Sequence, residues 1–179
     1  YDELFAPEHQ LEAILPPIKE ERDKWGDFPI IAAGGIWDRE DIEKIMDLGA
    51  DAVQLGTRFI GTHECDASPV FKQVLLDSKE EDIVIVSSPV GYPGRAVKTN
   101  LIKTLEPGTK KIQCISNCIF PCGRGKGARA VGYCIADSLG DAYLGRLQSG
   151  LFFSGANGYK LKEIVHVKEL IDELMTNVK

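Results

Sequence analysis

The first third of the chain alternates between apolar residues at helical spacing and short unbroken apolar runs. The apolar positions 11, 14, 15 and 18 share one face of a helix. Pro16 and Pro17 interrupt this pattern, because proline has no backbone N–H to donate within a helix. We therefore expect the helix to restart there, and we predict its best stretch at residues 17–25.

A compact apolar run at residues 29–33 is typical of a strand that is buried on both faces of a parallel sheet, and Gly34 and Gly35 end it abruptly. Asp38 follows as a suitable N-cap, since its carboxylate can accept a hydrogen bond from a backbone N–H of the first helical turn. Apolar side chains at positions 42, 45 and 46 give the predicted helix one buried face.

The pattern is repeated after Gly49, a residue suited to the left-handed position at the end of a helix. Residues 52–55 (AVQL) again have the pattern of a short buried strand, and a turn of small residues, Gly56 and Thr57, closes it. A strand, a helix and a second strand in this order predict a βαβ unit, in which the two strands are parallel neighbours.

Later segments predict a mixed succession of elements. Ser68 followed by Pro69 is typical of an N-cap and first helical residue, and residues 83–86 predict a strand. Residues 87–94 contain two prolines and two glycines, so we expect a loop there, of a kind that can act as a lid. Two further helices are predicted, at residues 128–139 and 167–175.

Composition narrows the classes of function. The 179 residues are 44% hydrophobic and 27% charged, which is ordinary for a globular protein with a sizeable core. The net charge of −6 argues against a nucleic-acid partner, because phosphate backbones require a basic surface. No apolar stretch approaches the roughly 18 to 20 residues that span a bilayer, and we find no signal-peptide pattern. We expect a cytoplasmic protein that acts on a small molecule, with no nucleic-acid or membrane partner.

The two turns at residues 34–35 and 56–57 form a candidate phosphate-binding site. Because the strands before them are predicted to be parallel neighbours, both turns lie at the same carboxyl edge of the sheet. Glycines let backbone N–H groups approach phosphate oxygens, and Thr57 adds a hydroxyl donor. In (β/α)8 barrels a phosphate site recurs in the loops after the seventh and eighth strands. Glycine turns that serve the architecture alone are the alternative that these residues leave open.

Longer stretches carry a resemblance to a known family. Residues 29–36 (PIIAAGGI) and 48–59 (LGADAVQLGTRF) closely resemble the corresponding segments of nitronate monooxygenases, also called 2-nitropropane dioxygenases, and of the related flavin-dependent enoyl-ACP reductases. Residues 94–97 (GRAV), with Asn100, look like the family's Gly-Arg segment after the barrel. Residues 151–157 (LFFSGAN) are similar to its glycine-rich C-terminal part.

The resemblance implies an α/β fold, namely the C-terminal part of an FMN-binding (β/α)8 TIM barrel with an additional, mainly helical C-terminal segment. Residues 1–82 would hold the last strands and helices of the barrel with the FMN-phosphate loops. Residues 83–179 would hold the lid loop, the cysteine-containing segment and the C-terminal helices. The FMN-binding residues that the resemblance implies are Gly34, Gly35, Gln54, Leu55, Gly56 and Thr57.

The resemblance also implies an oxidoreductase, and we expect a nitronate monooxygenase that oxidises alkyl nitronates with O2. The alternative within the family is an enoyl-ACP reductase that uses NAD(P)H. The family's proposed catalytic base is a histidine in an earlier barrel motif, which this sequence does not contain. None of His9, His63 and His166 stands in that context, and His63 is expected to be a solvated residue near a helix start. No catalytic residue is therefore assigned.

Two further groups of residues have candidate roles. Cys114, Cys118 and Cys122 recur every four residues, with Cys134 further on. Zinc sites favour closer pairs, so we expect reduced, packed thiols, while a metal-binding or iron–sulfur module remains the alternative from a different functional class. Arg95 and Lys98 are candidates for stabilising negative charge on a flavin or an anionic substrate, with simple solvation as the alternative.

The chain has 179 residues and begins with Tyr1, whereas a complete barrel has about 250 residues. We therefore expect it to be a segment of a longer polypeptide. An open sheet edge is prone to pair with other strands, so we expect it to be covered by the N-terminal part of the barrel or by a second copy of the chain.

Overall fold

The computed structural model describes residues 7–26, 28–106 and 131–176, which form two compact units. The first unit combines residues up to Glu64 with the segment from Ile164 onward, and the second unit is Cys65–Glu163. None of the helices in the described part of the chain has the length and the apolar character that crossing a bilayer requires. The predicted boundary between the barrel part (residues 1–82) and the segment after it (residues 83–179) stays a prediction.

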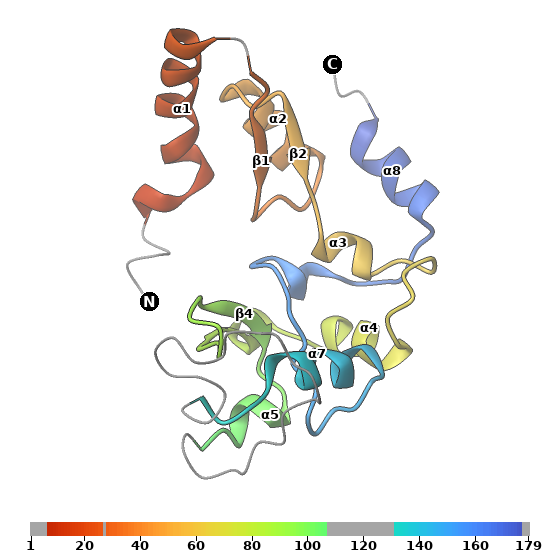
Figure 1. The fold of residues 1–179 in the computed structure, drawn as a ribbon. Helices are drawn as coiled ribbons and strands as arrows, with labels where there is room; N and C mark the ends of the chain where they lie inside the picture. Colours follow the sequence, from red (N-terminus) through yellow and green to blue (C-terminus); the bar gives the residue numbers. More distant parts are fainter. Residues whose placement is uncertain (1–6, 27, 107–130, 177–179) are drawn as a thin grey trace. The chain divides into compact units, whose positions relative to one another are not determined.

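The first unit contains the predicted βαβ motif, with further helices before and after it (Figure 1). β1 and β2 are parallel neighbours, as predicted, and the parallel sheet of the described residues has these two strands. The described residues therefore form a mixed α/β assembly rather than a closed barrel. In chain order the elements are η2 (Pro7–His9), α1 (Leu11–Trp25), β1 (Ile31–Ala33), α2 (Arg39–Asp47), β2 (Ala52–Gln54), α3 (Thr57–Ile60) and α8 (Val167–Met175).

α1 is continuous, so the prediction that the helix restarts at Pro16 and Pro17 was wrong. Both prolines are exposed, and their fixed φ is itself compatible with a helix even though each removes a backbone hydrogen bond. Tertiary contacts on either side compensate for that loss. Leu15 is only 2% exposed in the core, and Arg22, one turn beyond the prolines, forms an ion pair with Asp51 at 2.8 Å.

α2 begins and ends at the predicted residues. The carboxylate of Asp38 accepts a hydrogen bond from the backbone N–H of Asp41 at 3.0 Å, which confirms its role as N-cap. The carboxylate of Asp41 in turn accepts from the backbone N–H of Trp37 at 2.8 Å, so the loop before the helix is held as well. Gly49 has a φ of +108° just beyond the helix, in the left-handed region that favours glycine.

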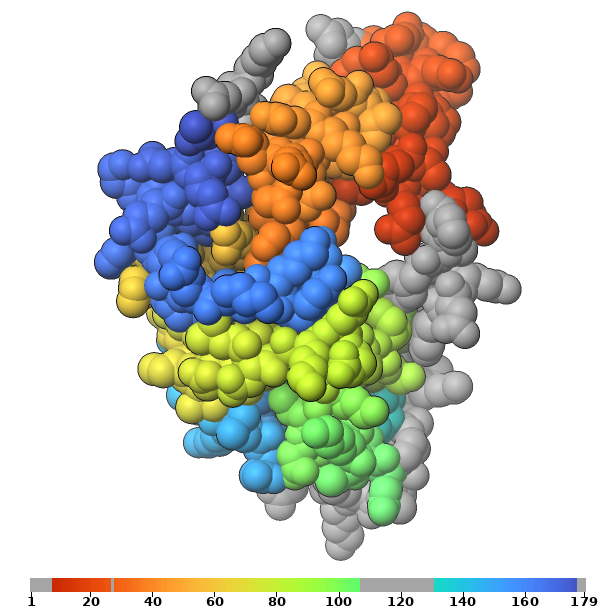
Figure 2. Space-filling model, turned by 180° about the vertical axis from the view of Figure 1, so that it is seen from behind, coloured from red at the N-terminus to blue at the C-terminus, as the bar shows by residue number. Residues whose placement is uncertain are grey.

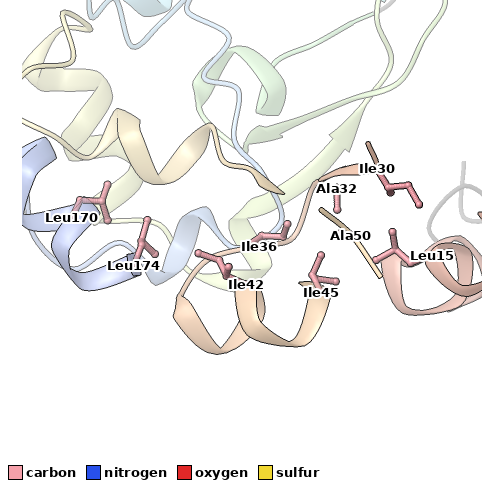
Figure 3. Close-up of a cluster of buried hydrophobic side chains, with 9 residues drawn as sticks. All are labelled: Leu15, Ile30, Ala32, Ile36, Ile42, Ile45, Ala50, Leu170 and Leu174. Atoms are coloured by element: carbon pink, nitrogen blue, oxygen red, sulfur yellow. The ribbon is translucent and has the colours of Figure 1, made fainter. Parts of the chain in front are cut away.

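One apolar cluster holds the first unit together (Figure 3). Its centre is formed by Ala32 of β1 with Ile42 and Ile45 of α2. α8 contributes two leucines at one end of the cluster, and α1 contributes Leu15 at the other. On the surface, α8 lies directly against α2 (Figure 2, dark blue beside orange). Since burying one such aliphatic side chain contributes about 1.5–3 kcal/mol, α8 is an integral part of this unit.

Only one face of the parallel sheet is covered within the first unit. Ala32 is 3% exposed, whereas Ile31 is 62% exposed and Ala33 is also exposed. Ala52 and Gln54 pair with these two residues and therefore lie on the same open face. The prediction that this strand is buried on both faces was wrong for the described residues, because the helices of this unit pack on the other face.

The second unit is built around an antiparallel hairpin. β3 (Ile83–Val86) pairs with β4 (Gly94–Val97), and residues 87–93 form the connecting loop. Ala96 of β4 is fully buried in an apolar cluster that also contains Tyr133 and Leu151. The remaining elements are α4 (Pro69–Leu76), η3 (Glu80–Asp82), α5 (Asn100–Lys103), α7 (Ile135–Tyr143) and η4 (Gly158–Lys160).

Predictions in the second unit had mixed outcomes. The Ser68 hydroxyl caps α4 by accepting from the backbone N–H of Phe71 at 3.2 Å, and β3 has the predicted bounds. β4 was not predicted, because Gly94 was assigned to the loop. The helix predicted at residues 128–139 is interrupted in its described part: residues 135–139 belong to α7, whereas residues 132–134 are not helical. The preceding Gly132 has a φ of +94°, which is incompatible with a continuous right-handed helix.

Candidate functional site

The two predicted turns lie at the same edge of the parallel sheet. The register pairs Ala33 with Gln54, the last residues of β1 and β2, so Gly34 and Leu55 leave the sheet next to each other. Carboxyl ends of parallel strands are the usual position of ligand sites in α/β sheets. The arrangement on which the phosphate hypothesis depends is therefore present.

Three glycines give these turns an accessible main chain. Gly34 and Gly35 have φ values of +104° and +72°, which side chains other than glycine rarely adopt. Gly34, Gly35 and Gly56 are exposed, and a Cβ atom built on any of them would meet no other atom within 4 Å. A side chain would therefore occupy space that now leaves the backbone open to a ligand. The turns therefore leave room for a group of the size of the FMN phosphate.

The other predicted binding residues are placed differently from one another. Gln54 is exposed at the end of β2, and Thr57 is partly buried as the first residue of α3. The side chain of Leu55 packs against the core cluster, so only its main chain can face a ligand at the sheet edge. The structure thus brings all six predicted residues to one edge and directs the side chain of Leu55 away from it.

An aromatic and ionic stack, which the sequence did not reveal, lies directly beyond the two turns. It consists of Trp37, Arg58 and Glu173. The guanidinium carbon of Arg58 lies 5.0 Å from the ring centroid of Trp37, and its Nη2 lies 2.8 Å from both carboxylate oxygens of Glu173. Trp37 is 7% exposed, and the Arg58 side chain is 12% exposed. No sequence signal links Arg58 to Glu173, because they are 115 positions apart.

A small cleft of about 90 Å³ is lined in part by Gly34 and Gly35. Glu12, Asp41 and Lys44 line it. Lys44 Nζ lies 2.6 Å from the Glu12 carboxylate, and this hydrogen bond lowers the pKa of Glu12. Two carboxylates against one paired ammonium make this cleft unfavourable for an anion. A phosphate at Gly34 and Gly35 is therefore better accommodated away from the Glu12 and Asp41 carboxylates.

The histidines do not form a catalytic group at this edge. His63 is exposed, as expected, but it follows the end of α3 rather than starting a helix. Its ring stacks on that of His166, with centroids 4.6 Å apart, and His166 Nδ1 lies 3.1 Å from Glu64. His9 is exposed at the end of η2. The catalytic base stays unassigned.

Arg95 and Lys98 occupy different surroundings within the second unit. Arg95 lies in β4, and burial lowers its pKa. Lys98 is exposed and lines a cleft of about 390 Å³ together with Asn100 and Lys103. Arg95 does not line that cleft.

Two cysteines fall within the described residues, Cys65 and Cys134, and neither forms a disulfide. Cys134 is the N-cap of α7, so the expectation that it lies within a helix was wrong. In the described ranges no group of His, Cys, Asp and Glu side chains has the arrangement of a metal site. Cys114, Cys118 and Cys122 lie outside the described residues, and the metal-module hypothesis that rests on them remains a prediction.

Curated relatives include probable nitronate monooxygenases of staphylococci. The protein from Staphylococcus saprophyticus is 39% identical over 75 residues, which cover 42% of this chain and 21% of the relative. The protein from Staphylococcus haemolyticus is 36% identical over 79 residues, which cover 44% of this chain and 22% of the relative. The chain therefore matches about a fifth of the length of these proteins.

Two solved structures share the fold. FabK from Thermotoga maritima is 26% identical, with a TM-score of 0.71 over 93% of this chain and 48% of FabK. Nitroalkane oxidase from Streptomyces ansochromogenes has a TM-score of 0.69 over 99% of this chain and 46% of the oxidase, and its 21% identity shows a common fold alone. The mixed α/β fold thus resembles part of these TIM-barrel proteins.

The strongest assignment comes from a family model that spans nearly the whole chain. The model is described as nitronate monooxygenase, and it matches residues 5–177. That range includes both glycine turns, the stack beyond them and the second unit. The chain belongs to the nitronate monooxygenase family.

Proposed function

We propose that this chain is the C-terminal part of an FMN-dependent nitronate monooxygenase, which oxidises alkyl nitronates with O2. In this proposal the FMN phosphate is bound by the main chain of Gly34, Gly35 and Gly56 and by the Thr57 hydroxyl. Gln54 and the main chain of Leu55 provide contacts beside it. The catalytic base belongs to a part of the protein outside this chain.

The observation that carries the proposal is the pairing of Ala33 with Gln54, which brings two glycine turns to one sheet edge. Backbone N–H groups held by a rigid sheet are suitable donors to a phosphate, because they need no rearrangement on binding. When FMN is bound, it supplies the redox chemistry that passes electrons from the nitronate to O2. The contribution of this chain is to hold and orient the cofactor through its phosphate.

The first experiment uses the full-length protein that contains this chain. Flavin released by acid from the purified protein is identified by chromatography, and the apoprotein is then titrated with FMN and with riboflavin. We expect stoichiometric FMN and a preference for FMN over riboflavin on the order of tenfold or more, because charge-assisted hydrogen bonds contribute about 1.5–3 kcal/mol each. Protein that neither contains FMN nor binds it would refute the proposal.

A pair of glycine variants tests the site itself. Gly34→Ala adds a Cβ at a φ of +104° within the proposed phosphate turn. Gly26→Ala introduces comparable backbone strain at a φ of +123°, but at the end of α1, where a Cβ also meets no neighbour. We expect Gly34→Ala to remove most of the preference for FMN over riboflavin and Gly26→Ala to retain it. Equal effects would show that the Gly34 turn is only architectural.

The similarity to FabK favours a second candidate, the reduction of enoyl-ACP by NAD(P)H through the same flavin. The phosphate turns serve both reactions equally, so binding data do not separate them. The FMN-loaded protein is therefore mixed anaerobically with an alkyl nitronate or with NADH or NADPH. Bleaching of the flavin by the nitronate supports the monooxygenase, whereas bleaching by a nicotinamide nucleotide alone supports the reductase.

We also propose that strands from outside this chain cover the open face of β1 and β2. The 62% exposure of Ile31 on that face supports this, because a large aliphatic side chain gains free energy when it is buried. The covering strands belong either to the N-terminal part of the barrel or to a second copy of this chain. Size-exclusion chromatography with light scattering of the full-length protein and of this chain alone distinguishes the two.

A further inference from the structure

We infer that Arg58 is a positioning residue, which fixes the two phosphate-binding turns relative to each other through its stack with Trp37 and Glu173. This inference rests on the proposed FMN site. It concerns how the site is held rather than which atoms contact the phosphate. Two contacts of Arg58, one with Trp37 and one with Glu173, carry the inference.

The position of Arg58 in the chain gives the first link. Arg58 directly follows Thr57, so its backbone continues the second turn into α3. Trp37 lies two residues beyond Gly35, and its backbone N–H donates to Asp41 at 2.8 Å. The contact between the Arg58 guanidinium and the Trp37 ring, at 5.0 Å, therefore joins the segments that leave the two turns.

Glu173 of α8 provides the second link. Arg58 Nη2 lies 2.8 Å from each of its carboxylate oxygens, while the arginine side chain is 12% exposed. An arginine that is largely buried and already paired with a carboxylate contributes little net positive charge to a neighbouring anion. Arg58 therefore acts through its position, and Glu173 fixes that position from a helix that belongs to the same unit.

This arrangement separates two roles that arginine can have near a phosphate. If Arg58 were a direct phosphate ligand, Glu173→Gln would release its guanidinium and strengthen FMN binding. If Arg58 is a positioning residue, the same change loosens the stack and weakens binding of the phosphate. Riboflavin lacks the phosphate, so its affinity is expected to change little in the second case.

The test uses the full-length protein with four variants. Arg58→Lys keeps the charge but removes the planar group that stacks and binds both carboxylate oxygens, and Trp37→Leu removes the aromatic face. Glu173→Gln removes one charge of the ion pair. Glu43→Gln is the matched control, because Glu43 pairs with Arg39 at 3.6 Å on the surface of α2. Dissociation constants for FMN and riboflavin are measured by flavin fluorescence, together with the melting temperature of each apoprotein.

We expect the ratio of the riboflavin to the FMN dissociation constant to fall about three- to tenfold in the three stack variants, which corresponds to about 0.7–1.4 kcal/mol. The control retains the wild-type ratio. An unchanged or increased ratio in Glu173→Gln, or a parallel loss of both affinities, would overturn the inference. If Arg58→Lys does not fold, Glu173→Gln decides the question alone. A wild-type protein without any preference for FMN would instead refute the proposed phosphate site.

Discussion

The carboxylate of Asp51 accepts a hydrogen bond from the backbone N–H of Ile30 at 2.7 Å, and it also accepts from Arg22 Nη1 at 2.8 Å. Ile30 and Asp51 precede β1 and β2, so one side chain connects the starts of both strands and ties them to α1. The hydrogen bond from Ile30, followed by the charge of Arg22, lowers the pKa of Asp51. The carboxylate is therefore more stable in the folded state than in the unfolded chain.

This contact predicts a specific dependence of stability on pH. Because the folded pKa of Asp51 lies below its unfolded value of about 3.9, the stabilisation is fully present above the unfolded value and is lost as the pH falls through the folded value. Asp51→Asn should lower the melting temperature at pH 7. The difference from the wild type should shrink below about pH 4. A difference that is constant from pH 7 to pH 3 would contradict the assigned cause.

The core of the first unit predicts a contrast between two isoleucines. Ile42 is 4% exposed in the central cluster, so Ile42→Ala should lower the free energy of unfolding by about 2–5 kcal/mol. Ile31 is 62% exposed, so Ile31→Ala in this chain alone should change the free energy of unfolding by less than about 0.5 kcal/mol. In the full-length protein Ile31→Ala should lower the free energy of unfolding by more than this, because other strands are proposed to cover that face. Urea unfolding of both proteins provides the measurement.

The two ends of α2 predict opposite effects of the same substitution. Asp38→Ala removes the N-cap hydrogen bond to Asp41 and should cost about 0.5–2 kcal/mol. Asp47 is the exposed last residue of the helix, where a negative charge opposes the helix dipole. Asp47→Ala should be neutral or slightly stabilising, by less than about 0.5 kcal/mol. Equal losses in chemical denaturation would argue against the cap.

Two glycines in the second unit predict changes of opposite sign. A Cβ on Gly145, whose φ is +77°, would lie 2.7 Å from Ser68 Oγ and 2.9 Å from Val70 Cβ. Gly145→Ala should therefore lower the melting temperature. Gly140 lies inside α7, and a Cβ there meets nothing within 4 Å. Gly140→Ala should stabilise the helix by about 0.4–1 kcal/mol, and a loss of stability would indicate that something covers this face.

Local signals explain what the sequence predicted well. The βαβ motif was readable because Asp38 and Gly49 mark the ends of α2 through their own side chain and backbone chemistry. The two glycine turns were readable for the same reason, since they directly follow apolar runs. Features of this kind depend on a few neighbouring residues, and the predicted phosphate edge needed only these and the parallel pairing.

Features that depend on distant parts of the chain could not be predicted. The continuity of α1 through Pro16 and Pro17 depends on burial of Leu15 and on the ion pair of Arg22 with a residue 29 positions later. Exposure of Ile31 depends on which elements pack on each face of the sheet. The partner of Arg58 is 115 positions away in α8. The spacing of apolar residues shows which face of a helix or strand is buried, but it does not show which other element packs against that face.

The placement of α8 has a consequence for the order in which the protein folds during synthesis. Its two core leucines leave the ribosome after the entire second unit, so the cluster around Ile42 lacks them while the second unit is being synthesised. Thr62 and Val165 form a β-bridge, which brings the points where the chain leaves and re-enters the first unit beside each other. The second unit is therefore an insertion between the two segments of the first unit, and the first unit can complete its core only after the second unit has been synthesised. Replacing the second unit by a short linker between these two points should give a first unit whose sequence is continuous.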